Sequence, residues 1–282
     1  MGGGTWTTTA YNASIRGLGF DSCTNMAKAS VQEVFHANKI DPILDPYEVI
    51  RECCDSEEHP ETIPVILALD VTGSMGTAAT TCAGKLDEIM GNLYSKVKDV
   101  EFLMMGIGDL ACDEAPIQAS QFESDVRIFD QTTKIYFEGG GGGNAFESYT
   151  AAWYFGLHNT KLDCWKRGKK GIIITMGDEP MNPYLPGRAL CNVLGRVTQD
   201  VDTDELYKQV CEKFDVYHIA INDRESSYAY YEDKIKNTWG KLLGDHLLIG
   251  GSNDLPRLIS KIVDNANNDT ETIVENTEGI TW

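Results

Sequence analysis

Three oxygen-bearing side chains follow a short apolar run near residue 70. The run VILAL at 65–69 is followed by Asp70, and Thr72 and Ser74 come next at a spacing of two. This spacing keeps the three side chains close together in one turn, and neighbouring glycines allow the backbone to turn sharply. A carboxylate and two neutral hydroxyls are hard ligands of the kind that suits Mg²⁺ or Mn²⁺. The stretch therefore predicts a divalent-metal site.

Other chemically active positions also follow predicted strands. Continuous apolar runs are typical of strands buried on both faces, and two more of them end in Asp109 and Asp178. Strands that alternate with helices form parallel sheets, whose ligands bind at the carboxyl ends of the strands. We therefore expect Asp70, Asp109, Asp178 and the glycine run at 139–143 to meet at one edge of the sheet.

The alternation of apolar runs with helical spacing predicts an α/β protein in three parts. We expect an N-terminal arm over 1–62, with an extended or weakly ordered start, then the α/β domain over 63–266 and a polar, frayed tail over 267–282. Further expected elements are strands at 126–130, 133–140, 215–222 and 247–250, helices at 77–96, 144–160, 202–214, 234–246 and 253–266, and loops at 110–125 and 226–233.

Other interpretations of these motifs fit the residues less well than a metal site does. Thr72 or Ser74 can cap the following helix, but a cap does not require Asp70. The GK pair at 84–85 lacks the glycine spacing and the following hydroxyl of a phosphate-binding loop. An aspartyl-phosphate enzyme would need an acid where Thr72 stands. The glycine run at 139–143 is typical of a flexible turn more than of a dinucleotide fingerprint.

Composition limits the classes of partner. The net charge of −19 repels phosphate backbones, so we expect no nucleic-acid partner. No apolar run is long enough to span a membrane, and the first residues lack the features of a secretory signal. The eight cysteines form no CxxC pair, and free thiols without an export signal favour a reducing compartment. We therefore expect a cytoplasmic protein that does not associate with membranes.

The sequence LDVTGSMG at 69–76 resembles the metal-ion-dependent adhesion site of von Willebrand factor A (vWA) domains, written DxSxS or DxTxS. The motifs RE..DS..HP at 51–60, GGGGN..ES at 140–148 and GDE at 177–179 are similar to those of uncharacterised bacterial and phage-encoded vWA proteins. The resemblance implies a doubly wound, mostly parallel sheet of Rossmann-like type with one antiparallel edge strand.

The resemblance also implies a ligand set. Asp70, Thr72 and Ser74 match the first loop of the family's site, with the two hydroxyls bound directly and Asp70 bound directly or through water. The family's later threonine has no counterpart here, so its place falls to Asn144, Glu147, Ser148 or water. The family's last aspartate arrives two residues late in TMGDE, and we assign it to Asp178 with Glu179 in reserve. Asp109 is expected to orient a bound water.

The function that the resemblance implies is metal-dependent protein binding without catalysis. Mg²⁺, or else Mn²⁺ or Ca²⁺, would keep an open position that an Asp or Glu of a protein partner fills. One alternative is a metal-dependent hydrolase with Glu147 or Glu179 as general base, because His218 is expected to be a core residue. Two further alternatives are an adaptor for an AAA+ ATPase of the MoxR type and a structural component of a phage particle.

Overall fold

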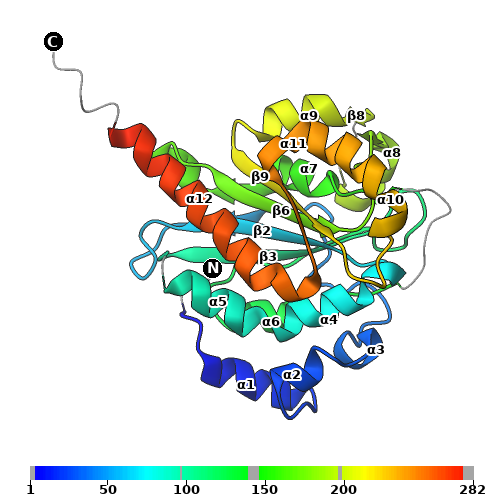
Figure 1. The fold of residues 1–282 in the computed structure, drawn as a ribbon. Coiled ribbons are helices and arrows are strands. Elements are labelled where there is room, and N and C mark those ends of the chain that lie inside the picture. The colour runs from blue at the N-terminus through cyan, green and yellow to red at the C-terminus, as the bar shows by residue number, and fades with distance from the viewer. Residues whose placement is uncertain (1–3, 96, 139–145, 196–198, 276–282) are drawn as a thin grey trace.

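Six strands form the central sheet of the protein, which is known here from a computed structural model (Figure 1). The structure describes residues 4–95, 97–138, 146–195 and 199–275, with only the backbone from 267 to 275. The sheet order is β10-β9-β6-β2-β3-β4. The bounds are β2 Ile63–Asp70, β3 Val100–Ile107, β4 Ile117–Ala119, β6 Gly171–Gly177, β9 Phe214–Ile221 and β10 Leu247–Gly250.

All neighbouring strands of this sheet are parallel except β3 and β4. The expectation of an α/β protein with a mostly parallel sheet and one antiparallel edge strand is therefore confirmed. The arrangement is compatible with a Rossmann-like fold.

Alternate residues of the central strands face two separate cores. In β2, Val65 and Leu67 join the core on one face of the sheet, whereas Ile66 joins the core on the other face. A strand with both faces covered must be apolar at consecutive positions, which explains the continuous apolar runs of β2, β3 and β6.

Helices cover both faces of the sheet in two layers (Figure 1). One layer consists of α4 (Gly76–Gly84), α5 (Leu86–Tyr94), α6 (Arg127–Thr132) and α12 (Leu255–Glu275). The other consists of α7 (Ala151–His158), α8 (Gly187–Leu194), α9 (Thr203–Val210), α10 (Tyr228–Ile235) and α11 (Lys241–Leu243). Among the described residues, no helix has both the length and the apolar character of a membrane span.

Two small sheets lie outside the central one. Strand β1 (Arg51–Cys53) pairs in parallel with β5 (Thr160–Leu162), and β7 (Tyr184–Leu185) pairs in antiparallel fashion with β8 (Val201–Asp202). Asp202 also caps α9, because its carboxylate accepts a hydrogen bond from the backbone N–H of Glu205 at 3.0 Å.

The N-terminal residues pack on the helical layer formed by α4, α5 and α6. They contain α1 (Thr8–Gly17), α2 (Cys23–Met26) and α3 (Val31–Val34). The side chain of Tyr11 is fully buried and donates a hydrogen bond to the carbonyl of Ala83 at 2.8 Å. The expectation of an extended or weakly ordered start is wrong for α1, because Thr7 caps this helix and its apolar residues are buried in the core.

Four other local expectations are also wrong. Residues 127–132 form α6 instead of a strand, and residues 133–138 form no strand. The antiparallel edge strand is instead β4, inside the predicted loop at 110–125. β4 has only three residues and depends on its two neighbours, since Ala119 donates its N–H to the carbonyl of Leu44 on the side away from β3. The predicted loop at 226–233 is largely α10, which buries Tyr228 and Ile235 seven residues apart on one face.

Two other predicted boundaries also lie elsewhere. Helix α7 begins at Ala151 instead of near 144, and α12 runs across residue 266 as far as Glu275, so the chain does not leave the helix at 267.

The buried contact of Tyr11 gives a prediction for the N-terminal residues. Tyr11→Ala should lower the free energy of unfolding by about 3–5 kcal/mol, because it empties a buried site between α1 and the core. Denaturant unfolding measures this loss. Tyr230→Ala is the matched control, because that side chain is 83% exposed and its loss should change stability by no more than about 0.5 kcal/mol. Equal values for the two variants would show that α1 does not belong to the cooperative core.

Candidate metal site

The strand order brings the predicted acids to one edge of the sheet. Strand β2 lies between β3 and β6, and all three run parallel. Asp70 ends β2 beside Ile107 of β3, and Asp109 and Asp178 follow the ends of β3 and β6. The predicted convergence of these three acids at the carboxyl edge is therefore confirmed. The glycine run at 139–143 lies outside the described residues.

Asp70 is fully buried, and both of its carboxylate oxygens accept hydrogen bonds from the protein. Oδ1 accepts from the backbone N–H of Thr72 at 2.8 Å and from its hydroxyl at 2.5 Å. Oδ2 accepts from the hydroxyl of Tyr149 at 2.6 Å. No motif of the sequence points to Tyr149, which directly follows the predicted residues Glu147 and Ser148 in the chain.

Aromatic side chains form the wall behind Asp70. The ring of Tyr149 makes edge contacts with His218 and Trp239, which stack on each other at a centroid distance of 3.9 Å. Trp239 lies in a π-helical turn, Lys236–Gly240, and donates its indole N–H to the carbonyl of Glu179 at 3.1 Å. His218 is a buried core residue as expected, and burial lowers its pKa to about 3. The wall is therefore rigid and poor in charge.

Asp178 is fully buried, and only one of its two carboxylate oxygens has a hydrogen-bond partner among the described residues. Its Oδ2 accepts a hydrogen bond from the backbone N–H of Ser227 at 2.5 Å, whereas its Oδ1 has no hydrogen-bond partner among the described residues. Burial raises the pKa of Asp178, and the Ser227 N–H and the side chain of Ser74 oppose this rise. Ser74 is partly exposed and lies close enough to Asp178 to act on its charge.

The loop before α7 brings Glu147 to the same edge. Glu147 is 4% exposed, forms an isolated parallel bridge with Met181, and its Oε2 has no hydrogen-bond partner among the described residues. Ser148 holds the neighbouring loop, since its hydroxyl accepts the N–H of Leu110 at 3.0 Å and its own N–H donates to the carbonyl of Gly108 at 3.1 Å. The remaining candidate, Asn144, lies outside the described residues.

Asp109 and Glu179 occupy the border of this cluster. The carboxylate of Asp109 accepts the N–H of Ala111 at 2.9 Å, and its backbone N–H donates to Asp113 at 2.7 Å. Glu179 is partly exposed, and its Oε2 is a buried atom without a hydrogen-bond partner among the described residues.

The electrostatics show that these carboxyls share one space. Burial and the charge of Asp178 raise the pKa of Asp70 to about 7. Burial, followed by the charges of Asp70 and Glu179, raises the pKa of Glu147 to about 10. Burial, Asp70, Asp178 and Asp109 raise the pKa of Glu179 to about 7. Burial is the largest cause in each case and repulsion from other carboxyls adds to it, so the members of the cluster do not all ionise together without a compensating positive charge.

Two carboxyl oxygens without hydrogen-bond partners among the described residues suggest that a cation would fit at this edge of the sheet. Asp178 Oδ1 and Glu147 Oε2 belong to side chains that are more than nine-tenths buried, and a buried charge without a partner is strongly unfavourable. Carboxylates and hydroxyls are ligands that Mg²⁺ and Mn²⁺ accept, so the donor types fit such an ion. Within the described residues, however, no three His, Cys, Asp or Glu side chains are arranged to hold an ion together. A site here would therefore depend on the hydroxyls of Thr72 and Ser74 as well.

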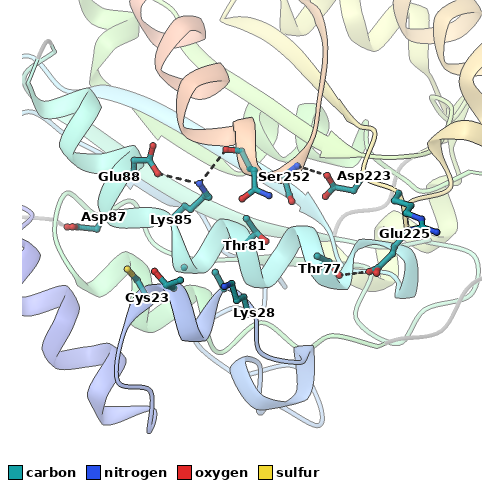
Figure 2. Close-up of a pocket in the computed structure, with 15 residues that line it drawn as sticks. Cys23, Lys28, Thr77, Thr81, Lys85, Asp87, Glu88, Asp223, Glu225 and Ser252 are labelled. Carbon is teal, nitrogen blue, oxygen red and sulfur yellow. Dashed lines mark hydrogen bonds and ion pairs between the residues drawn. The ribbon is translucent and has the colours of Figure 1, made fainter.

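A separate pocket lies between α2, α4 and the loop after β9, and has a volume of about 750 Å³ (Figure 2). Figure 2 shows Thr77, whose hydroxyl donates to Glu225 at 2.9 Å, and Asp223, which accepts the N–H of Ser252 at 3.0 Å. None of the predicted ligands lines this pocket. The pocket is a hollow between the N-terminal residues and the core.

Two solved structures are distantly similar to this chain. No protein family and no curated protein matches the sequence. The pilus adhesin SpaC of Lactobacillus rhamnosus GG, in an open conformation, is similar in structure with a TM-score of 0.45 and 11% identity over 82% of this chain. Proximal thread matrix protein 1 of the mussel byssus is similar with a TM-score of 0.47 and 13% identity over 75% of this chain. The chain spans 31% of the adhesin's length and 48% of the mussel protein's.

The raised pKa values predict how stability depends on pH. Glu147 has a pKa of about 10 in the folded protein against an ordinary 4.5, and Asp70 and Glu179 have about 7. Between about pH 5 and 8 the unfolded chain therefore releases protons that the folded protein retains. In a chelator, the free energy of unfolding should fall as pH rises, by up to about 1.4 kcal/mol per pH unit for each such carboxyl. The contributions of Asp70 and Glu179 end near pH 7, whereas that of Glu147 continues through the whole window.

Urea unfolding at several pH values in a chelator measures this slope. Glu147→Gln should flatten it and should stabilise the metal-free protein at pH 8, because the neutral amide loses no proton. Glu212→Gln, at an exposed position after α9, is the control and should leave the slope unchanged. A slope that is unaffected by Glu147→Gln would mean that Glu147 does not retain its proton in the folded protein.

Proposed function

We propose that the protein binds a divalent cation at this edge of the sheet and uses it to bind another protein. The observation that carries the proposal is the pair of deeply buried carboxylate oxygens, Asp178 Oδ1 and Glu147 Oε2, that have no hydrogen-bond partner among the described residues. A cation would neutralise the repulsion that raises the pKa values of this cluster. The vWA resemblance of LDVTGSMG points to the same class of function.

The candidate residues take different roles in this proposal. Asp178 and Glu147 supply anionic oxygens, Thr72 and Ser74 supply hydroxyls, and Asn144 is a further candidate that lies outside the described residues. Glu179 and Asp109 lie around the site, and Ser148 fixes the loop beside Asp109. A bound Mg²⁺, or Mn²⁺ or Ca²⁺, would supply a concentrated positive charge with a coordination position for a carboxylate of the partner.

We propose the cytoplasm as the compartment, because all eight cysteines of the chain, each of them described, are free thiols. A role beside an AAA+ ATPase or in a phage particle would use the same surface. A hydrolase would need Glu147 or Glu179 as its base, since His218 is buried and its ring bonds to Thr175 at 2.8 Å. Turnover of generic phosphoester or peptide substrates with Mn²⁺ distinguishes an enzyme from a binding protein.

Removal of one anionic ligand tests the cation site. Mn²⁺ titrated into metal-stripped protein should bind saturably, and Asp178→Asn should weaken binding by more than the roughly 10–100-fold that loss of an outer partner costs. Calorimetry measures the affinity, and circular dichroism checks that the variant is folded. Asp215→Asn is the matched control, because Asp215 lies near the start of β9, at the opposite edge of the sheet. Absence of saturable Mn²⁺ binding to the parent protein would refute the proposed site.

A peptide array then tests the partner chemistry. Each Asp- or Glu-containing peptide is paired with its Asn or Gln counterpart and probed with the protein in Mn²⁺ and in a chelator. We expect binding that needs both the acidic residue and Mn²⁺. If the cation binds but no acidic peptide depends on it, the metal site stands and the proposal of carboxylate recognition fails.

A further inference from the structure

We infer that Tyr149 is a positioning residue of the cation site, which holds Asp70 as a hydrogen-bond acceptor and leaves direct ligation to Asp178 and Glu147. This inference rests on the proposed cation site and goes beyond it, because neither the vWA resemblance nor the sequence motifs point to a tyrosine here. It divides the acids of the cluster into two groups by what their oxygens already bind.

The first group is Asp70, whose oxygens are already occupied. Thr72 donates twice to Oδ1, and the phenol of Tyr149 donates to Oδ2 at 2.6 Å. All three donors come from residues that are buried, so water does not compete for them. A carboxylate that accepts hydrogen bonds on both oxygens has a fixed orientation, and it acts on a nearby ion through its charge or through a water.

The second group is Asp178 and Glu147, which keep one free oxygen each. The backbone N–H of Ser227 holds Asp178 through Oδ2 and leaves Oδ1 unpartnered, and Glu147 likewise leaves Oε2 unpartnered among the described residues. These two carboxyl oxygens have no hydrogen-bond partner among the described residues, so a cation would bind them directly once their groups have lost their protons, with the Ser74 side chain beside Asp178. The division therefore follows from hydrogen bonds that the protein makes before any ion arrives.

The surroundings of Tyr149 are built to hold its ring in one place. Tyr149 is fully buried, and its ring packs edge-on against His218 and Trp239 at centroid distances of 5.4 and 5.7 Å. A Cβ on Gly177 would overlap the ring and hydroxyl of Tyr149, so the absence of a side chain there creates the space for the ring. Gly177 is the last residue of β6, directly before Asp178. One strand end therefore supplies both a direct ligand and the space for the residue that positions Asp70.

The test compares two tyrosines that each lose a buried hydrogen bond. Tyr149→Phe removes the donor to Asp70, whereas Tyr11→Phe removes a donor of similar length, 2.8 Å to the carbonyl of Ala83, on the other side of α4 from the sheet. Both side chains are fully buried, so the two variants should lose similar stability. The probe is Mn²⁺ alone, with affinity measured by calorimetry and the ion's ligand field by electron paramagnetic resonance.

We expect Tyr149→Phe to bind Mn²⁺ on the order of 10–100-fold more weakly and with an altered resonance spectrum, because Asp70 loses its fixed orientation. Tyr11→Phe should match the parent protein in both. Gly177→Ala should reproduce the effect of Tyr149→Phe, because its methyl group displaces the ring while the hydroxyl is still present, which separates the position of the ring from the presence of its hydroxyl.

Three results would overturn the inference. If Tyr149→Phe binds Mn²⁺ with the affinity and spectrum of the parent, Tyr149 has no positioning role and the cation site stands without it. Equal losses in Tyr149→Phe and Tyr11→Phe would show a general effect of stability. If the parent protein does not bind Mn²⁺ saturably, the proposed function fails and this inference fails with it.

Discussion

The burial of carboxyl groups close to one another is the constraint on which the rest of this structure depends. Asp70 and Asp178 lie at the ends of adjacent parallel strands with no exposed surface, and Glu147 joins them from the loop before α7. In such surroundings charge is costly, and the raised pKa values of all three groups express that cost. A sheet that served only packing would place apolar residues at these ends. Acids at these positions lower the stability of the fold, and the proposed cation site gives a reason for their presence.

The surrounding elements act on that cost in two opposite ways. Backbone and side-chain donors satisfy Asp70 completely and Asp178 in part, which is how proteins usually stabilise buried carboxylates. The aromatic wall of Tyr149, His218 and Trp239 raises the cost of charge on the neighbouring carboxyls. It excludes water, and this strengthens their electrostatic interactions. The π-helical turn brings Trp239 into this wall and ties it to the backbone of Glu179. Such turns are often found at functional sites.

The departures from the vWA pattern concern the same acids. The late aspartate of TMGDE still reaches the carboxyl edge, because β6 runs to Gly177 and Asp178 follows directly. If Glu147 and Asp178 both bind the ion, as proposed, the site is more acidic than the one that the vWA resemblance implies. A more acidic site favours the cation and weakens the attraction for an external carboxylate. Partner recognition by this protein would then depend more on the surface around the ion.

Much of this architecture is determined by local sequence. The runs of β2, β3 and β6 are apolar at consecutive positions because both faces of the sheet are covered, and that pattern predicts buried parallel strands and the acids at their ends. The cap at Asp202 and the core position of His218 follow from equally local chemistry. Only the tertiary structure decided the rest. Three-residue β4 exists because β3 and Leu44 supply its partners, and α6 and α10 are set by which residues the core buries. The hydrogen bond from Tyr149 to Asp70 joins positions 79 residues apart and needs the space at Gly177. No local sequence pattern can therefore predict it.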